Sequence, residues 1–356
     1  SYAELESGFA AITLNTTFQA DGNIGSETNR VQFAGSQEEV SLFTNSGDIW
    51  IGGLSDVTGV TYNIIDTYSG APAVDSGSLS IVNNGGITPI RLLGNIDTSN
   101  TGPGAGGIQR FGAAGIANPL TLLTNVNLLS AGPGGGGDIF LWGDISEDGT
   151  RTLDVDSGSA NIYLYMDIIE TSLSQTWTAN NIYIDPQTNS PDSELQLFTS
   201  NNPITVNTTG SIIISDDDNL IINTGSGLGN ISLQAVTGGS ENPNKDITLR
   251  AGAGTVILNG PLGDESELRN LTLRSDDLQI VNTGSIAISE TLTLFTENGT
   301  TPMNVGWNGG AGNWNLEDDE IARLLFADSI IAGESGNQGG GGAQTTFDTA
   351  DFSSVS

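Results

Sequence analysis

Carboxylates carry most of the chemistry available to this sequence, and two acidic runs could bind a metal ion. Calcium takes six to eight oxygen ligands and tolerates irregular loops, so it is the ion that such runs favour. The candidate ligands are Asp216, Asp217, Asp218, Asp264, Glu265 and Glu267. The calcium-binding nonapeptide is absent as an array, and charge runs at turns usually stay solvated. We therefore expect weak surface sites for calcium at most, and no other cofactor.

A pair of carboxylates could also hydrolyse a glycoside. Asp154 and Asp156 are spaced to lie on one face of a strand, and such pairs act when held about 5–9 Å apart with one pKa raised. The chain has no His and only 9 Lys plus Arg, so acid–base work would fall to carboxylates, Tyr or Lys245. Carboxylates solvated at a turn do not meet these conditions. We expect a protein that is not an enzyme, with a carbohydrate-active or carbohydrate-binding protein as the alternative.

The tryptophans are far apart in the sequence and form no readable row for stacking on sugars. Each is expected in packing or at a cap, unless the fold aligns some of them. They are Trp50, Trp142, Trp177, Trp307 and Trp314.

One short phrase repeats along the chain: an apolar residue, a usually small or polar one, then another apolar one. Turn residues separate the copies, and this alternation with period two predicts short strands with one buried face. The clearest copies start at Leu195, Ile204, Ile212, Leu220, Ile231, Ile247, Val256, Leu271, Leu278, Ile286 and Leu292. Looser copies start at Ile49, Leu79, Leu120, Ile139, Leu153, Ile162 and Ile182.

The spacing of these copies predicts a parallel β-helix, an all-β solenoid. A strand plus its corner takes about eight residues, so three make a coil of about 25, a period typical of repeat architectures. A hairpin-built sandwich would want longer strands joined by tight turns. A single coil cannot bury its own apolar face, so stacked coils must form one continuous core.

Composition limits the partners. The chain carries 42 Asp plus Glu against 9 Lys plus Arg, a formal net charge of −33. Such a surface repels nucleic acid, and no stretch of about 20 apolar residues could span a bilayer. We expect no nucleic-acid partner and no membrane insertion. With no cysteine, neither disulfides nor a thiolate site can form.

The predicted solenoid covers 1–312, with Gly-rich corner insertions at 102–117 and 131–137, because Gly and Pro interrupt the strand rhythm there. Residues 313–356 form a Trp-containing helical cap or spacer and an irregular Gly-rich tail. Asn315 caps a helix over 316–325, and Ile321, Leu324 and Leu325 form its apolar stripe. A strand then follows at 329–331.

The two ends of the chain share a degenerate phrase. Leu5 and Phe9 near the start parallel Ile321 and Phe326 near the end, and Glu4 and Glu320 are 316 residues apart. Equivalent ends would suit a tandem array or a subunit that stacks end to end. The residues expected in this assembly are Trp314, Glu320, Leu324, Leu325, Leu5 and Phe9.

The strand phrase, together with Gly312-Asn313-Trp314-Asn315-Leu316 and the following Glu320, Leu324 and Ile330, resembles large secreted bacterial surface proteins related to filamentous haemagglutinin. That resemblance implies a β-helical adhesin or surface filament, extracellular and located at the cell surface.

These observations together predict a structural or adhesive protein: a rigid solenoid of an adhesin, surface layer or fibre that associates end to end or with tandem copies of itself. Two alternatives stay open. One is a carbohydrate-binding or carbohydrate-active β-helix whose partner is a surface polysaccharide, and the other is a calcium-dependent binding module.

Overall fold

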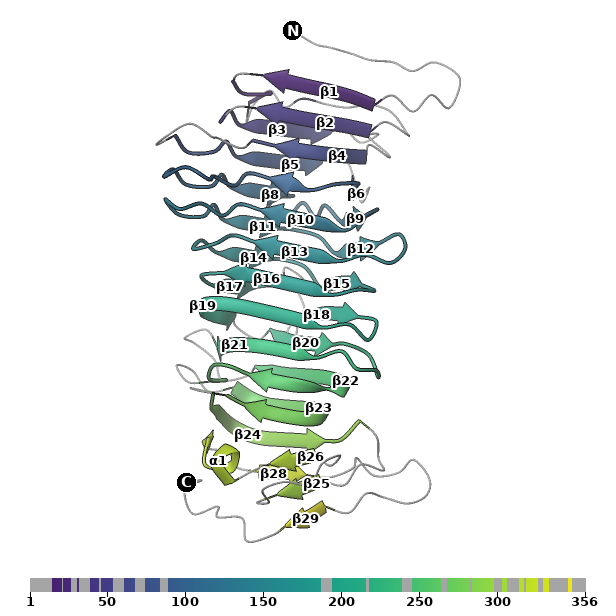
Figure 1. The fold of residues 1–356 in the computed structure, drawn as a ribbon, viewed down its shortest axis with the longest axis vertical. Coiled ribbons are helices and arrows are strands. Elements are labelled where there is room, and N and C mark those ends of the chain that lie inside the picture. The colour runs from purple at the N-terminus through teal and green to yellow at the C-terminus, as the bar shows by residue number, and fades with distance from the viewer. Residues whose placement is uncertain are drawn as a thin grey trace. The chain divides into compact units, whose positions relative to one another are not determined.

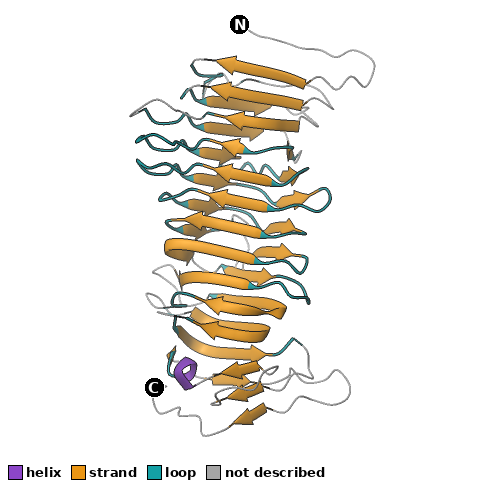
Figure 2. Ribbon diagram, viewed as in Figure 1, coloured by secondary structure: helices purple, strands orange, loops and turns teal. Residues whose placement is uncertain are grey.

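A computed structural model describes most of the chain. The described residues are 15–20, 22–26, 31, 39–44, 46–53, 61–67, 74–83, 89–186, 194–215, 218–238, 245–263, 268–281, 284–297, 303–305, 314–316, 318–325, 329–332 and 345–347. The chain divides into two compact units, one of residues 1–171 and 176–183, and the other of residues 172–175 and 184–356. Each unit is a stack of parallel strands (Figures 1 and 2), which confirms the predicted β-solenoid.

The first unit has three ladders of parallel strands, and each strand pairs with strands one coil away. One ladder contains β1 (Asn15–Ala20), β2 (Glu39–Thr44), β4 (Thr61–Asp66), β7 (Ile96–Asp97), β10 (Val126–Leu129), β13 (Leu153–Asp156) and β16 (Gln175–Ala179). The second contains β3 (Ile49–Gly53), β5 (Leu79–Asn83), β8 (Gln109–Phe111), β11 (Ile139–Leu141), β14 (Ile162–Leu164) and β17 (Ile182–Ile184). The third joins β4 to β6 (Ile90–Leu92), β9 (Leu120–Leu122), β12 (Ile145–Glu147) and β15 (Ile168–Thr171).

The second unit repeats this plan with longer strands. Its main ladder contains β18 (Glu194–Thr199), β20 (Asn219–Asn223), β22 (Asp246–Leu258), β23 (Leu268–Ile280), β24 (Ile286–Phe295) and β28 (Ser329–Ala332). Beside it, β19 (Ile204–Ile214) pairs with β21 (Ile231–Gly238), and β21 pairs with the later half of β22. Two predicted phrases therefore share one long strand in β19, β22, β23 and β24, where separate short strands were predicted.

The predicted inward positions form the core. The first and third residues of every listed phrase are at most 5% exposed, from Ile49 and Ile51 to Leu292 and Leu294. Parallel pairing stacks similar apolar residues of successive coils on one another. Ile247, for example, lies between Leu220 and Leu271. Burying one such side chain stabilises the folded state by about 1.5–3 kcal/mol, so this apolar stack is the main source of stability.

Coil length varies more than the sequence suggested. In the second unit Leu195, Leu220, Ile247, Leu271 and Leu292 are successive partners, which gives coils of 25, 27, 24 and 21 residues. In the first unit Leu79 pairs with Ile49 and with Gln109, which in turn pairs with Ile139, so these coils have 30 residues. Extra corner residues, rather than extra strands, account for the difference.

A column of glycines marks one corner of the first unit. Gly47, Gly77, Gly107 and Gly137 stack on one another, and a Cβ built on Gly107 would lie 1.9 Å from the Gly77 carbonyl oxygen. The backbones approach so closely here that only glycine fits. The tracts 102–117 and 131–137 therefore differ from the predicted insertions: they contribute to this column, and the first also contains strand β8, whose Phe111 is fully buried.

Hydroxyl side chains hold the same corner. Thr98 donates its Oγ1 hydrogen to the Gly107 carbonyl at 2.7 Å. Thr44, Thr67 and Ser130 donate in the same way to the carbonyls of Gly47, Gly77 and Gly137. These hydroxyls are buried, so each bond satisfies a polar group that would otherwise be costly to desolvate.

The predicted helix over 316–325 is wrong in extent. The structure has one helical turn, α1 (Asp318–Ile321), and then strand β27 (Leu324–Leu325), which pairs in parallel with Ile286 and Ala287 of β24. The edge of β24 supplies hydrogen-bonding partners that a longer helix would forgo. The strand predicted at 329–331 is confirmed as β28. A separate small sheet joins β25 (Met303–Val305), β26 (Trp314–Leu316) and β29 (Thr345–Phe347).

We expect Gly107→Ala to lower the free energy of unfolding by about 1–3 kcal/mol, because the new methyl group meets backbone that cannot move aside. Gly22→Ala is the matched control, since a Cβ there meets nothing within 4 Å. Urea denaturation followed by far-ultraviolet circular dichroism measures both. Equal effects of the two substitutions would contradict the tight glycine column.

Candidate functional site

The structure brings no metal site together from the residues that it describes. Asp216, Asp217, Asp264, Glu265 and Glu267 lie outside the described residues. Asp218 is 9% exposed, and its N–H donates to the Ser215 carbonyl at 3.1 Å. Across the described ranges, no group of three or more potential ligand side chains is placed to hold a metal ion. The calcium sites stay a prediction.

Asp154 and Asp156 lie on the outward face of β13, half-buried, as their spacing predicts. The Asp156 carboxylate accepts a hydrogen bond from the Gly158 N–H at 2.8 Å. This bond fixes the turn after the strand, so Asp156 has a local structural role.

Of the residues expected in assembly, Glu320 and Leu324 can be placed in full. Glu320 is 9% exposed and accepts a hydrogen bond from the Ile280 N–H at 3.1 Å, while Arg323 donates to the Ile280 carbonyl at 2.7 Å. Leu324 is 3% exposed. Leu325 of β27 pairs with Ala287 of β24, and Trp314 of β26 pairs with Met303 of β25. Leu5 and Phe9 lie outside the described residues.

An aromatic row on the second ladder of the first unit was not foreseen. We define it as Phe140, Trp142, Tyr163, Tyr165 and Tyr183. Ring centroids are 4.6 Å apart for Phe140 and Tyr163, 4.9 Å for Tyr163 and Tyr183, and 4.9 Å for Trp142 and Tyr165. The rings of these three pairs are within 9° of parallel. All five side chains are half-buried.

The row follows from the strand pattern and the register together. The outward positions of β11, β14 and β17 carry Phe140, Tyr163 and Tyr183, and Trp142 and Tyr165 follow two of these strands. Parallel pairing of Phe140 with Tyr163 places one ring on the next. Trp142 is in packing, as expected, and it is one of the tryptophans that the fold aligns with other rings, which the sequence left open. The signal in the sequence was the aromatic middle residue shared by the phrases that start at Ile139, Ile162 and Ile182.

Stacking determines what the row can bind. Because neighbouring rings cover each other's faces, the row shows mainly ring edges to solvent. Such stacking stabilises the fold, at about 0.5–1.5 kcal/mol per pair, but a flat ligand needs a free ring face. At one end the Arg110 guanidinium lies over the Phe140 ring, 4.8 Å from its centroid. Arg110 makes no hydrogen bond or ion pair with any residue that the structure describes.

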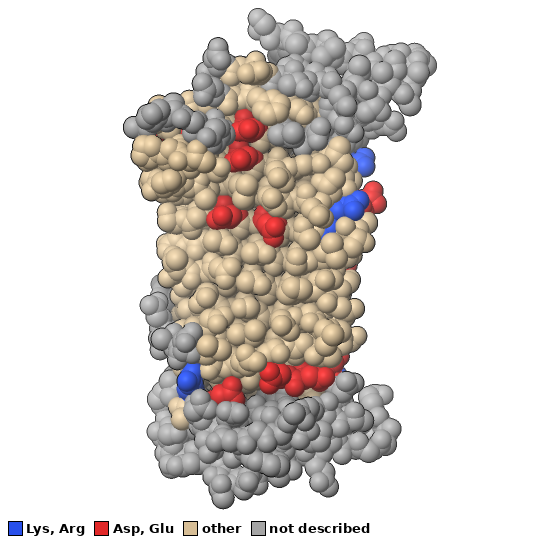
Figure 3. Space-filling model, viewed as in Figure 1, with Lys and Arg blue, Asp and Glu red and all other residues tan. Residues whose placement is uncertain are grey.

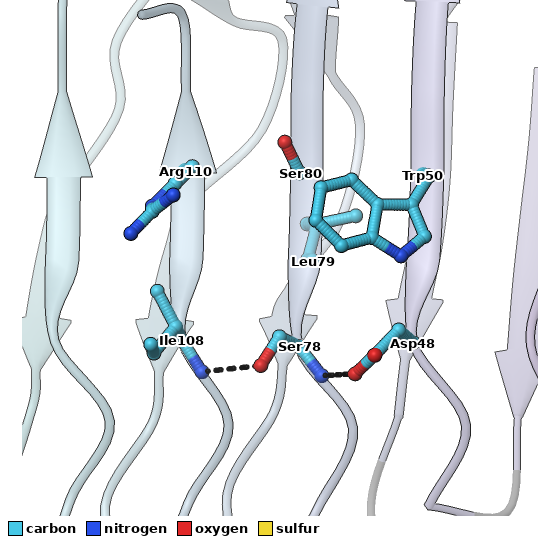
Figure 4. A pocket seen from close by; sticks show the side chains of 7 residues that line it. All are labelled: Asp48, Trp50, Ser78, Leu79, Ser80, Ile108 and Arg110. Carbon is cyan, nitrogen blue, oxygen red and sulfur yellow. Dashed lines mark hydrogen bonds between the residues drawn. The ribbon is translucent and has the colours of Figure 1, made fainter. Parts of the chain in front are cut away.

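On the side of Arg110 away from Phe140, the next residue in this column of outward-facing residues is Ser80, which has a small side chain. Strand pairing aligns Trp50 with Ser80 and Ser80 with Arg110, so Ser80 is the rung between a ring and a guanidinium. A cavity of about 130 Å³ opens here, lined by Asp48, Trp50, Ser78, Ser80, Ile108 and Arg110. We call it the Trp50 hollow. Figure 4 shows the indole lying across the strand of Ser80, with Arg110 on the far side.

A polar ladder forms the floor of this hollow. Asp48 Oδ1 accepts from the Ser78 N–H at 2.8 Å, and Ser78 Oγ accepts from the Ile108 N–H at 3.1 Å (Figure 4). The same position one coil earlier is Asn23, whose Oδ1 accepts from the Asp48 N–H at 2.9 Å. Each coil thus fixes the start of the next strand through a side-chain oxygen. The other carboxylate oxygen of Asp48 has no partner within the described ranges.

Asp144 and Asp167 form a carboxylate pair that sequence reasoning missed, because they are 23 residues apart. Asp144 Oδ1 accepts from the N–H groups of Asp167 and Ile168 at 3.1 and 3.0 Å. Burial raises the pKa of Asp167, and the charge of Asp144 raises it further. The raised pKa means that the folded protein favours the protonated form of the Asp167 carboxyl. The folded state therefore loses stability as the pH rises through this pKa and the carboxyl ionises beside Asp144. Asp144 itself serves to hold the next coil.

Three arginines of the second unit pair with acidic side chains. Arg250 and Arg274 are in register on successive coils, and both contact the Glu297 carboxylate, at 2.6 and 2.8 Å. The hydrogen bond to Glu297 raises the pKa of Arg250. Arg269 binds Asp246 with two hydrogen bonds, of 2.8 and 2.7 Å. The three arginines are 28–39% exposed, whereas the Glu297 side chain is only 9% exposed. These pairs link residues of different coils and so help to order the stack.

On the face shown in Figure 3, most of the described surface carries neither acidic nor basic side chains, and the acidic ones gather in small separate groups. The net charge therefore does not form one continuous acidic groove on that face. None of the helices in the described ranges has both the length and the apolar character needed to cross a bilayer.

No protein-family model matches the chain, and no curated protein or solved structure matches it. The fold places this protein in the class of parallel β-solenoids. Its function must therefore be inferred from the residues on its surface.

The Tyr163 hydroxyl provides a test of the aromatic row. Burial raises its pKa, and Asp138 raises it further, so its contribution to stability is present below about pH 10 and lost as pH rises through the folded-state pKa. We expect Tyr163→Phe to keep the stability at pH 7 and to flatten the loss above pH 10. Tyr163→Ala should lose about 1–3 kcal/mol at pH 7, because its close stacking on Phe140 and on Tyr183 disappears. Denaturation midpoints between pH 7 and 11 measure both, and equal stabilities of the two variants at pH 7 would contradict the stacking.

Proposed function

We propose that this chain is a structural and adhesive β-solenoid of the cell surface, without enzymatic activity. The observation that carries the proposal is the use of polar side chains between coils. Asp48, Asn161, Asn219 and Asn270 each accept a backbone N–H of the following coil through a side-chain oxygen. A protein built to catalyse would aim such groups at one concave site, whereas here they brace the stack.

The described carboxylates support a non-catalytic role. Asp156 fixes a turn, Asp144 and Asp246 bond to neighbouring coils, and Glu297 neutralises two arginines. Glycoside hydrolysis requires two carboxylates facing one substrate across about 5–9 Å. Carboxylates bound to backbone N–H groups and guanidinium ions are poorly placed for that work.

An extracellular location and a place among surface proteins related to filamentous haemagglutinin belong to the same proposal. Support comes from the repeated strand phrase, whose inward residues are buried throughout the described coils. The phrase and the Trp314 segment are what this chain shares with that group.

Self-association is the partner that we propose for the structural role. Strand β28 pairs with β24 along one edge, and the described strands offer no partner for its other edge. Ile331 of β28 is 49% exposed. An open parallel edge with an exposed apolar side chain can pair with another chain. A second copy of this solenoid would present strands of the same spacing.

Carbohydrate binding is the second candidate function, and the Trp50 hollow, with Asp48 and Arg110 among its lining residues, is the observation that favours it. Such a surface would give an adhesive solenoid something to bind.

Antibodies against this chain test the proposed role on cells of the source organism. We expect immunogold label on intact cells, located on extended surface structures that contain many copies of the chain. The matched control is the same antibody preparation after absorption with the purified protein. Label that appears only after the cells are permeabilised would contradict an extracellular structural role.

A further inference from the structure

We propose that Tyr163 and Tyr183 form a site of oxidative cross-linking, at which a haem peroxidase and hydrogen peroxide join the two side chains as dityrosine. The two residues lie on β14 and β17, which pair with each other on neighbouring coils of the first unit. The link would tie these coils together covalently. The reaction needs only the fold and an oxidant, so it does not depend on the proposed place at the cell surface.

The geometry of the two rings favours coupling. The ring centroids of Tyr163 and Tyr183 are 4.9 Å apart and the ring planes differ by 7°, because paired strands are about 4.8 Å apart. Both side chains are half-buried and face outward. Stacking leaves the ring edges toward solvent, and in tyrosine the edge carries the hydroxyl group and the ortho carbons. Rotations of such side chains are fast, so the rings can tilt until two ortho carbons meet.

The composition leaves tyrosine and tryptophan as the main side chains that an oxidant can reach. The chain has no Cys and no His. Its two methionines, Met166 and Met303, are 3% and 1% exposed, so the residue types that are oxidised most readily are absent or buried. Tyr62 and Trp177 are also buried. The aromatic row, in contrast, gathers one tryptophan and three tyrosines whose side chains are half-buried.

The register between coils selects the pair that couples. Tyr163 stacks on Phe140 with one face, and phenylalanine has no hydroxyl group from which a phenoxyl radical could form. Tyr165 stacks on Trp142, and its ring centroid is 6.3 Å from that of Tyr163. Tyr183 is therefore the tyrosine that lies closest to Tyr163 within the described ranges.

The coupling step consumes one molecule of hydrogen peroxide per link. Each phenol gives up one electron and one proton, which leaves a phenoxyl radical on each ring. The radicals join through a new bond between their ortho carbons, and the hydrogen on each of these carbons then moves to the phenolic oxygen of its own ring. Hydrogen peroxide takes up the two electrons and two protons and becomes two molecules of water. The linked pair has two hydrogen atoms fewer than the separate tyrosines.

A link between Tyr163 and Tyr183 would stabilise the folded chain. The two residues are 20 positions apart in the sequence, and a cross-link that closes such a loop restricts the unfolded chain. No disulfide can supply this restraint, because the chain has no cysteine. We therefore expect the linked protein to unfold at a higher urea concentration than the unmodified protein.

The test treats the full chain with horseradish peroxidase and hydrogen peroxide and maps the products by mass spectrometry. Proteolysis at acidic residues separates Tyr163 from Tyr183, because Asp167 and Glu170 lie between them. We expect a linked pair of peptides that contains Tyr163 and Tyr183 and lacks two hydrogen atoms. Its yield per chain should not change when the protein is diluted, since both rings belong to one molecule. Urea denaturation of the linked protein measures the gain in stability.

Tyr183→Phe should abolish the link while it keeps the stacked ring, and Tyr163→Phe should do the same. Tyr165→Phe is the matched control, because it removes another phenol of the aromatic row, and it should leave the link unchanged. Circular dichroism of every variant separates lost reactivity from lost fold. The proposal is overturned if the oxidised protein contains no Tyr163–Tyr183 link, if Tyr165→Phe abolishes it, or if tyrosines link only between molecules. None of these results would alter surface labelling of cells, so the structural role is tested separately.

Discussion

Parallel stacking of coils is the constraint on which the rest of the structure depends. Each residue lies about 4.8 Å from its counterparts one coil away, so every position must tolerate a near-copy of itself on both sides. Leucine and isoleucine meet this condition in the core and glycine meets it at the tight corner, where a Cβ would strike the next backbone. Asn, Asp and Ser meet it at strand starts, because a side-chain oxygen reaches the next N–H.

The same constraint creates the candidate site. Outward positions in register become columns, and a column of aromatic residues becomes a stack whose ring faces are covered. In the first unit the column is interrupted at Ser80, between Trp50 and Arg110, and the Trp50 indole lies across this position (Figure 4). One ladder therefore carries both the aromatic stack and the residues that line the Trp50 hollow.

The sequence predicted the features that depend on the local alternation of apolar and polar residues. It did not predict the contacts that depend on the register between coils. Each phrase shows which residues face inward, so Ile247 and Leu249 could be assigned to the core. Whether Tyr163 meets Phe140 depends on the length of the corners between them, which local patterns do not specify. The helix expected over 316–325 failed similarly, since an apolar stripe at Leu324 suits a helix or the last strand of a stack, and the free edge of β24 decides between them.

Disulfide trapping tests the stacked register most directly, and the natural absence of cysteine makes it clean. Thr248 and Thr272 are outward-facing partners on adjacent coils. Their separation of about 4.8 Å suits a disulfide, whose Cα atoms are usually 4.4–6.8 Å apart. The account predicts that Thr248→Cys/Thr272→Cys cross-links rapidly under mild oxidation, whereas Thr248→Cys/Gln279→Cys, seven residues out of register, does not. Equal cross-linking of the two variants, or none in either, would contradict the parallel stack.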